Sequence, residues 1–243
     1  MSYRRRSNRQ VEEAPSPLLD EATRRKMGEQ AVALAKAVGY DSAGTVEFVA
    51  GQDRSFYFLE MNTRLQVEHP VTELCTQRDL VREMVRVARG EKLGYGQDQV
   101  RRSGHAIQCR VYAEDPATGF LPSPGRIQLL RTPSGPGVRD DSGVYEGAEV
   151  SSYYDPLISK LCVWAEDRPR ALAKMRRALS EYVVGGICTN IPFHLALLEH
   201  PDYVAGRFDT GFLGRHEKEL LVSDRVPSDR ADVLAIGAAC AMA

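Results

Sequence analysis

Apolar residues recur at every third or fourth position along several stretches of the chain. The clearest stretch is 20–38, which opens on a capping aspartate, Asp20, and is followed by Gly39. This pattern predicts a helix with an N-cap and a glycine stop. The same period predicts three more helices, over residues 79–88, 169–183 and 190–198.

Alternating apolar and polar residues predict the strands. Residues 44–49 and 55–60 alternate on either side of the turn-rich stretch 51–54, which indicates a β-hairpin. From position 104 onward, short apolar runs are separated by Pro- and Gly-rich turns, a pattern typical of an antiparallel sheet. Its expected strands are 105–112, 125–131, 143–150 and 158–165. The polar stretch 94–103 suits a connection between two units, and the fold class is predicted to be α+β.

Charged and amide side chains occupy every second position where the hairpin ends. Glu60, Asn62 and Arg64 share one face of an extended chain, and Glu68 continues that face. Oxygen ligands suit Mg²⁺, and a forked cation suits a planar or phosphoryl anion. The hairpin can also bring Glu47 opposite Glu60, which is unfavourable unless a cation lies between the two acids. The spacing alone is equally compatible with a solvated strand face.

The motif that contains these residues is similar to a known signature. L-E-M-N-T-R-L resembles the metal-binding signature of ATP-grasp ligases, and with Q-V-E-H-P directly after it the run resembles biotin carboxylase. Carbamoyl-phosphate synthetase shares the E-x-N-x-R core without that tail, and it is the enzymatic alternative. Further segments resemble biotin carboxylase in the same order: V-E-E-A-P, G-H-A-I-Q-C-R, E-D-P, F-L-P-S-P-G and Y-Y-D-P-L-I-S-K-L.

The resemblance implies a division into domains. Residues 1–91 correspond to the C-terminal half of an ATP-grasp domain, 104–213 to the biotin carboxylase C-terminal domain, and 214–243 to the start of a linker. The family's N-terminal nucleotide-fold domain and glycine-rich lid are not recognisable, and no G-x-G-x-x-G or P-loop motif replaces them. We therefore expect an ATP-dependent ligase present as a truncated chain that does not turn over alone. The alternative is a non-catalytic chain with a structural or docking role.

The resemblance also implies roles for individual residues in the hairpin and the segment after it. Mg²⁺ or Mn²⁺, bound with ATP, is assigned to three side chains: Glu47, Glu60 and Asn62. Bicarbonate is assigned to Arg64, Gln66 and the backbone N–H of Val67, with Glu68 as the base that takes its proton. The implied reaction activates bicarbonate as carboxyphosphate and then carboxylates biotin.

Three residues outside that segment complete the implied site. Arg110 falls on the arginine that contacts the biotin ureido oxygen and stabilises the enolate, and Asp155 is a candidate to orient it. Arg9 falls where the family has a lysine for bicarbonate, and the exchange is not neutral because guanidinium is a permanently charged fork. From the residues alone, Arg110 is also compatible with a surface arginine, Asp155 with a turn cap, and residues 4–9 with a solvated basic tail.

Charge and hydropathy argue against nucleic acid and membranes as partners. The net charge of −1 gives no positive excess for nucleic acid or an anionic membrane. No apolar run approaches the roughly 20 residues that cross a bilayer, and no signal peptide is visible. We expect a cytoplasmic protein, or a protein of an organelle matrix if it is processed.

Cysteine and histidine spacing predicts no metal centre. The five cysteines lack C-x-x-C spacing and suit reduced thiols, and the histidines form no H-x-x-x-H pair. His69, in the motif, is expected to support its loop through a hydrogen bond. By resemblance, the expected partners are a biotin carboxyl carrier protein or domain that holds biotin, a carboxyltransferase subunit, and a second copy of the chain.

Overall fold

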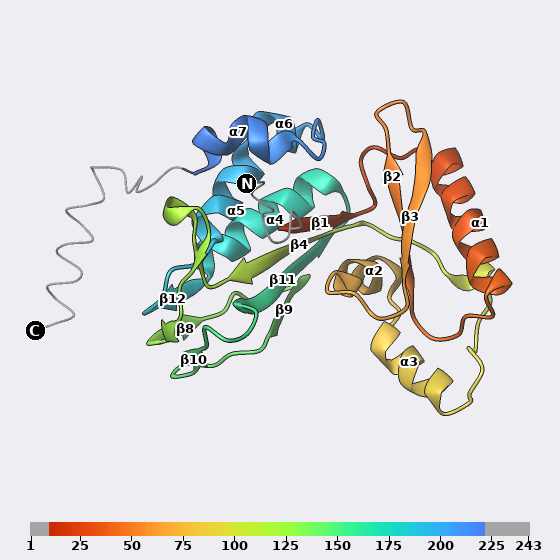
Figure 1. Ribbon diagram of the computed structural model, residues 1–243, viewed down its shortest axis with the longest axis horizontal. Helices are drawn as coiled ribbons and strands as arrows, with labels where there is room; N and C mark the ends of the chain where they lie inside the picture. The colour runs from red at the N-terminus through yellow and green to blue at the C-terminus, as the bar shows by residue number, and fades with distance from the viewer. Residues whose placement is uncertain (1–9, 222–243) are drawn as a thin grey trace, which may run out of the picture.

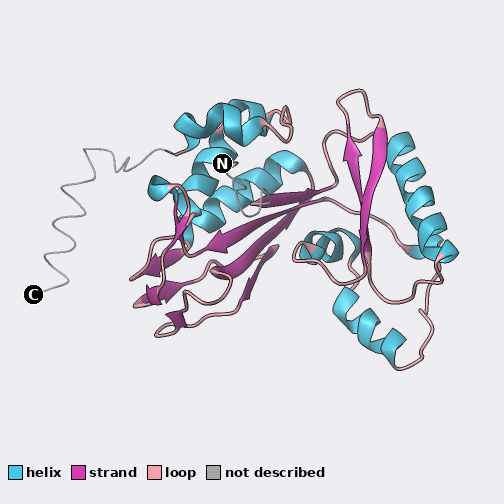
Figure 2. Ribbon diagram, viewed as in Figure 1, coloured by secondary structure: helices cyan, strands magenta, loops and turns pink. Residues whose placement is uncertain are grey.

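The computed structural model describes residues 10–221 as strands and helices in two connected parts (Figure 1). One part is built on a four-stranded sheet, and the other on a two-stranded hairpin, as the colouring by secondary structure makes clear (Figure 2). The predicted α+β class is confirmed. No helix among the described residues is long and apolar enough to cross a membrane.

The four-stranded sheet is antiparallel throughout, in the order β1-β4-β11-β9. Its members are β1 (Val11–Ala14), β4 (His105–Tyr112), β11 (Leu157–Ala165) and β9 (Val138–Ser142). All eight residues of β4 are buried, because helices cover both faces of the sheet. β1 falls within residues 1–91 of the predicted division, and it pairs with β4, which falls within residues 104–213.

Helices α4 (Arg168–Glu181) and α5 (Ile191–Glu199) lie over one face of this sheet (Figure 1). Apolar side chains at alternate positions of β4 and β11 meet the inner side of α4, which places Ile107, Leu161 and Met175 in one fully buried core. The opposite face of β4 carries Ala106, which contacts the short helix α2 (His69–Thr76). Gln108 and Arg110 share that second face by alternation.

Three two-stranded ladders surround the sheet, and two of the predicted strands were wrong in their limits. The ladders pair β5 (Glu114–Asp115) with β6 (Leu121–Pro122), β7 (Gly125–Arg126) with β10 (Glu149–Val150), and β8 (Leu129–Arg131) with β12 (Val183–Gly185). The predicted strand 125–131 is divided between β7 and β8. The predicted strand 143–150 is a loop up to residue 148, and Gly147 there has φ +93°, outside the β region.

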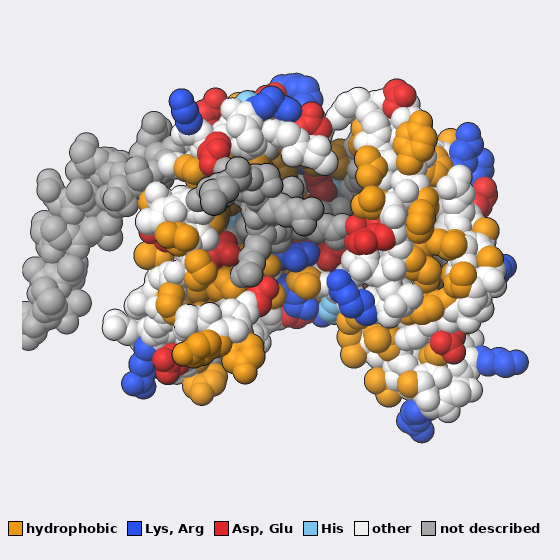
Figure 3. All heavy atoms as spheres, in the orientation of Figure 1, with side chains coloured by type: hydrophobic (Ala, Val, Ile, Leu, Met, Phe, Trp, Pro, Cys, Tyr) orange, Lys and Arg blue, Asp and Glu red, His pale blue; other side chains and the backbone are white. Residues whose placement is uncertain are grey.

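The other part contains β2 (Thr45–Ala50) and β3 (Phe56–Asn62), with α1 (Glu21–Ala37) and α3 (Leu80–Ala88) beside them. The predicted hairpin and both helices are confirmed. Neither α1 nor α3 contains a buried residue, and Tyr57 and Phe58 of β3 are 70% and 55% exposed. Apolar side chains are accordingly prominent on the surface of this part (Figure 3).

Two short helices and two 3₁₀ turns complete the described chain. They are α6 (Pro201–Val204), α7 (Phe212–Leu220), Gln97–Gln99 and Pro116–Thr118. Helices α6 and α7 lie side by side beyond α5, on the outside of the larger part (Figure 1). Asp20, Asp79 and Asp167 each accept a hydrogen bond from the backbone N–H three residues later, which is why α1, α3 and α4 begin there.

Candidate active site

A charged cavity of about 280 Å³ opens where the hairpin faces the four-stranded sheet. Its walls come from β2, β3, the segment before α2, and β4: Glu47, Glu60, Asn62, Arg64, Gln66, Val67, Glu68 and Arg110. Figure 3 shows the molecule hollowed between its two parts, with acidic and basic side chains beside the hollow. The structure thus gathers eight of the ten residues that the sequence assigned to the site.

The two acids of the hairpin lie directly opposite each other, as the sequence predicted. Glu47 pairs with Glu60 in the strand register, beside an irregularity between Glu47 and Phe48. The Asn62 amide donates to both acids, with Nδ2 at 3.0 Å from Glu47 Oε1 and 3.2 Å from Glu60 Oε1. Gln66 Nε2 donates to the same Glu47 oxygen at 2.8 Å. Amide N–H groups therefore lie where positive charge is needed between the carboxylates.

This donor set fits a hard divalent cation. The two carboxylates and the Asn62 side chain supply the oxygen ligands that Mg²⁺ prefers. Asn62 presents its nitrogen to the acids here, and a half-turn of its amide presents Oδ1 in the same place. A cation between Glu47 and Glu60 would replace these N–H donors and remove the repulsion between the acids.

Glu68 and Arg110 join the two parts of the molecule across the cavity. Arg110 Nη2 lies 3.0 Å from Glu68 Oε2, although the two residues come from different parts. Glu68 is the residue before α2, and its side chain makes no cap hydrogen bond with the helix, so its carboxylate can face the cavity. Arg64 is exposed at the rim, and its Nη1 donates to the Leu65 carbonyl at 3.2 Å.

The cavity also depends on Glu12 of β1, which the sequence analysis did not assign. Glu12 Oε1 lies 2.5 Å from Arg110 Nη2, and Gln108 Nε2 donates to Glu12 Oε2 at 3.1 Å. Burial raises the pKa of Glu12, and the charge of Arg110 opposes that rise. The V-E-E-A-P segment was recognised, but only the pairing of β1 with β4 shows that Glu12 meets Arg110.

The backbone of Arg110 is held by buried polar side chains on the far side of the sheet. Asn190 Nδ2 and His194 Nε2 lie 2.9 and 2.8 Å from the Arg110 carbonyl oxygen. Burial lowers the pKa of His194 to about 4, so the ring is neutral and can donate through Nε2. These contacts fix the strand at the point where Arg110 leaves it.

A second group of charged residues fixes the segment that carries Glu68. Lys160 Nζ donates to His69 Nε2 at 3.2 Å, and His69 Nδ1 lies 3.1 Å from Glu73 Oε1. Glu73 is buried, and its other oxygen pairs with Arg139 Nη1 at 2.7 Å. The predicted supporting hydrogen bond of His69 is confirmed, and it ties the start of α2 to strand β11.

The last two assigned residues are not among the cavity walls. Asp155 Oδ1 accepts from the Leu157 N–H at 2.9 Å, the turn-capping arrangement that was its alternative interpretation. Its charge adds to the effect of burial in raising the pKa of Tyr112 and of Glu114. Arg9 lies outside the described residues. The roles of both stay predictions.

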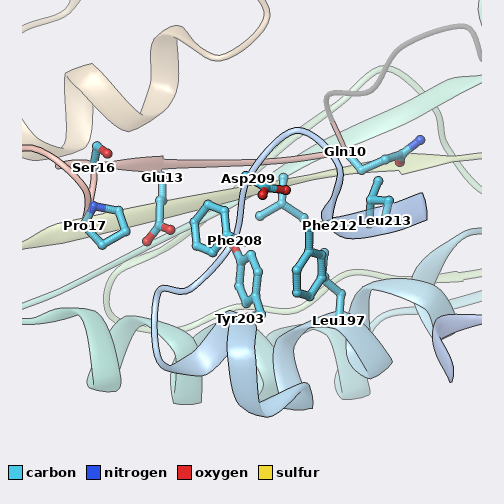
Figure 4. A pocket seen from close by; sticks show the side chains of 11 residues that line it. Gln10, Glu13, Ser16, Pro17, Leu197, Tyr203, Phe208, Asp209, Phe212 and Leu213 are labelled. Carbon is cyan, nitrogen blue, oxygen red and sulfur yellow. The ribbon is translucent and has the colours of Figure 1, made fainter. Parts of the chain in front are cut away.

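Another cavity of about 300 Å³ lies between β1 and the C-terminal helices (Figure 4). Tyr203, Phe208 and Phe212 make much of its wall, with Glu13 beside them. Glu13 is already paired, at 2.7 Å from both His105 Nε2 and Arg168 Nε. Because its charge is satisfied, this apolar cavity offers less chemistry than the charged one.

Two family models match the chain. Residues 108–215 match "Biotin carboxylase C-terminal domain", and residues 1–95 match "Carbamoyl-phosphate synthase L chain, ATP binding domain". The first match separates the chain from the carbamoyl-phosphate synthetase alternative, which the E-x-N-x-R core alone left open.

Curated relatives and solved structures agree with this assignment. The propionyl-CoA carboxylase alpha chain of Ruegeria pomeroyi is 52% identical over 99% of this chain and 38% of its own length. Biotin carboxylase 1 of Bacillus subtilis is 50% identical, over 89% of this chain and 48% of its own length. The biotin carboxylase domain of a thermophilic 2-oxoglutarate carboxylase bound to bicarbonate has a TM-score of 0.88 at 43% identity, covering 90% of this chain and 49% of that one.

A further structure, from Hydrogenobacter thermophilus, shows such a domain as a dimer with MgADP and bicarbonate. Its TM-score is 0.86 at 43% identity, over 88% of this chain and 48% of that one. The chain thus spans between about a third and a half of the length of these relatives. The chain therefore matches the C-terminal part of biotin carboxylase over most of its length.

Proposed function

We propose that the charged cavity is the metal, bicarbonate and biotin side of a biotin carboxylase active site. The observation that carries the proposal is the convergence of Arg110, Glu68 and the Glu47–Glu60 acid pair on one cavity. A cation site, a base and a fixed guanidinium are the three elements that ATP-dependent carboxylation of a ureido nitrogen needs. ATP transfers its γ-phosphoryl group to bicarbonate, which gives carboxyphosphate and ADP, and carboxyphosphate then carboxylates biotin with release of phosphate.

Each group has a task that follows from its placement. Mg²⁺ held by Glu47, Glu60 and Asn62 supplies charge neutralisation for phosphoryl transfer when it is bound. The bicarbonate anion is bound by hydrogen-bond donors on one wall of the cavity: Arg64 at the rim, Gln66, and the backbone N–H of Val67. Glu68 takes the bicarbonate proton, and Arg110 stabilises negative charge on the ureido oxygen of biotin.

Glu68 and Arg110 are paired before any substrate binds, so biotin must compete with Glu68 for Arg110. The pair joins Arg110 Nη2 to Glu68 Oε2 at 3.0 Å. The same pair keeps Arg110 pointed into the cavity. Biotin would compete with Glu68 for the guanidinium, so the pair must open or be shared when the ureido oxygen binds.

We assign ATP, Mg²⁺ or Mn²⁺, and biotin carried on a carrier protein or domain, together with a carboxyltransferase subunit and a second copy of the chain. The dimeric Hydrogenobacter domain with MgADP and bicarbonate supports part of this assignment. We propose the cytoplasm, or an organelle matrix, as the compartment, which fractionation of tagged protein would check.

The test is a chimera in which this chain replaces the matching half of Bacillus subtilis biotin carboxylase 1, which is 50% identical to it. The unmodified chimera should hydrolyse ATP in the presence of bicarbonate and form carboxybiotin. Glu60→Gln should abolish ATP cleavage, because one anionic metal ligand is lost. Glu29→Gln, at an exposed position of α1, is the control and should leave both activities unchanged.

Two variants separate the proposed roles within the cavity. Glu68→Gln should lower bicarbonate-dependent ATP hydrolysis by about 10²-fold or more, the usual size of a lost general base. Arg110→Ala should keep much of that hydrolysis and lose carboxybiotin formation. Parallel loss of both activities in both variants would show that the division of roles is wrong. Residues 1–243 without the rest of a carboxylase should show no ATP-dependent carboxylation of free biotin.

A further inference from the structure

Three metal-ligating side chains converge on the outside of the larger part, away from the charged cavity. His200 precedes α6, and His216 and Glu219 are one turn apart on α7. His200 Nε2 lies 3.1 Å from both His216 Nδ1 and Glu219 Oε2, and the latter two atoms are 3.3 Å apart. Three atoms that can bind a metal, one from each side chain, therefore form a nearly equilateral triangle.

The triangle has the size of one face of a metal coordination tetrahedron. Ligand atoms about 2.0–2.1 Å from a tetrahedral Zn²⁺ ion are separated by about 3.3 Å. The three observed separations are within about 0.3 Å of that value. A cation placed over the triangle would need no large movement of the three side chains, and its fourth position would be open to water.

No placement of protons on two neutral histidine rings makes all three of these contacts hydrogen bonds. The backbone N–H of Asp202 donates to His200 Nδ1 at 3.2 Å, so a neutral His200 ring carries its proton on Nε2. If His216 Nδ1 is unprotonated, it faces the Glu219 carboxylate as one acceptor against another. If it is protonated, it faces the His200 N–H as one donor against another. No arrangement of two neutral rings satisfies all three pairs.

The surroundings hold the two rings and provide the outer partner that metal-bound histidines usually have. The buried Phe212 ring packs against both, with centroids 5.1 Å from His200 and 4.8 Å from His216. The other ring nitrogen of His216, Nε2, lies 3.9 Å from the Asp202 carboxylate. A carboxylate there favours the tautomer with its proton on Nε2, which leaves Nδ1 free for a metal. Phe212 also lines the apolar cavity (Figure 4).

We propose that His200, His216 and Glu219 form a site for a divalent late transition metal of the Zn²⁺ class, which fastens α7 to α6. Two imidazole nitrogens and one carboxylate favour Zn²⁺, Ni²⁺ or Co²⁺ over Mg²⁺ and Ca²⁺, which prefer all-oxygen sites. Binding through His200 Nε2 moves its proton to Nδ1, so the hydrogen bond from Asp202 opens and the first turn of α6 adjusts. This site is independent of the proposed carboxylase chemistry.

Zn²⁺ titration of residues 1–243 by calorimetry tests the proposal. The exposed thiol of Cys188 is a competing ligand, so all proteins should carry Cys188→Ser and be alkylated at the remaining accessible thiols. With excess Mg²⁺ present to fill the proposed cation site at Glu47 and Glu60, we expect one Zn²⁺ per chain and a rise in the melting temperature. His216→Gln and Glu219→Gln should each weaken binding at least tenfold. Glu217→Gln, which removes the same charge from the same helix, should bind as the parent does.

Three results would overturn the proposal. They are no saturable Zn²⁺ binding, binding unchanged in His216→Gln and Glu219→Gln, or binding weakened equally by Glu217→Gln. Circular dichroism of each variant should match the parent, so that lost binding is not lost folding. Co²⁺ gives a second readout, because tetrahedral Co²⁺ absorbs visible light more strongly than octahedral Co²⁺. A strong visible band in the parent that is absent in His216→Gln would support the site independently of affinity.

Discussion

Arg110 is held by two carboxylates at once, and this arrangement sets the energetics of the charged cavity. Glu12 lies 2.5 Å and Glu68 3.0 Å from the same Nη2 atom. Glu12→Gln keeps the shape and removes one of the two charges that stabilise the buried guanidinium. We expect the free energy of unfolding to fall by about 1–3 kcal/mol, the usual cost of a lost charge-assisted hydrogen bond. Urea denaturation measures it.

Glu12 is also expected to act in turnover as a positioning residue for Arg110. In the chimera, Glu12→Gln should raise the KM for free biotin by about tenfold, equivalent to about 1.4 kcal/mol, while bicarbonate-dependent ATP hydrolysis stays near the parent rate. Glu29→Gln serves again as the exposed control, with effects on stability near zero. An unchanged KM for biotin would show that Glu68 alone is enough to hold Arg110.

Glu114 gives a prediction for the dependence of stability on pH. Burial, with the nearby charge of Asp155, raises the pKa of Glu114 to about 7. The native state therefore holds a proton that the unfolded state has lost between about pH 4.5 and 7, so this residue makes stability fall as pH rises through that range. After allowance for its partial exposure, the loss is about 1 kcal/mol. Glu114→Gln should stabilise the protein at pH 8 and have little effect at pH 4.5, measured by urea denaturation.

At the scale of elements, the spacing of apolar residues predicted the helices and strands that have a regular apolar face. The helix at 20–38 and the strand at 105–112 are examples, and their limits differ from those of α1 and β4 by one residue or not at all. The sequence did not predict β9, because Arg139, Asp140 and Asp141 give it a charged pattern. The strand pairs with β11, whose Lys160 lies 3.3 Å from Asp141 and offsets its charge. A local pattern cannot show a partner that is distant in sequence.

Helix α2 was missed for a different reason, and it yields a prediction. It has only eight residues, too few for a clear period, and it begins inside the Q-V-E-H-P motif, at His69. Glu73 secures it, with His69 on one oxygen and Arg139 on the other. Glu73→Ala should cost about 3 kcal/mol of unfolding free energy, because buried partners lose their counter-charge. Glu181→Ala, at an exposed helical pair, should cost less than about 1 kcal/mol. Equal costs would mean that the buried group contributes no more than a surface pair.

At the scale of the whole molecule, the motif predicted which residues form the site but not how the two parts meet. Spacing placed Glu60, Asn62 and Arg64 on one face, and the hairpin placed Glu47 opposite. The contact of Glu68 with Arg110 joins residues 42 positions apart, and it depends on α2 packing against the sheet. Glu12, which β1 carries into the sheet, could not be found without that pairing. The same limit applies to His200 and His216, whose convergence depends on α6 and α7.

The two parts differ in how much apolar surface they bury, and this predicts a difference in local stability. Strands β4 and β11 lie in a buried core covered by helices, whereas β3 has Tyr57, Phe58 and Leu59 more than half exposed. Local opening is cheapest where few apolar contacts hold an element. In native-state hydrogen exchange of residues 1–243, hydrogen-bonded amides of β3 should exchange at least 10²-fold faster than those of β11. That ratio corresponds to about 3 kcal/mol of opening free energy, and equal protection of the two strands would show that the hairpin unfolds only together with the core.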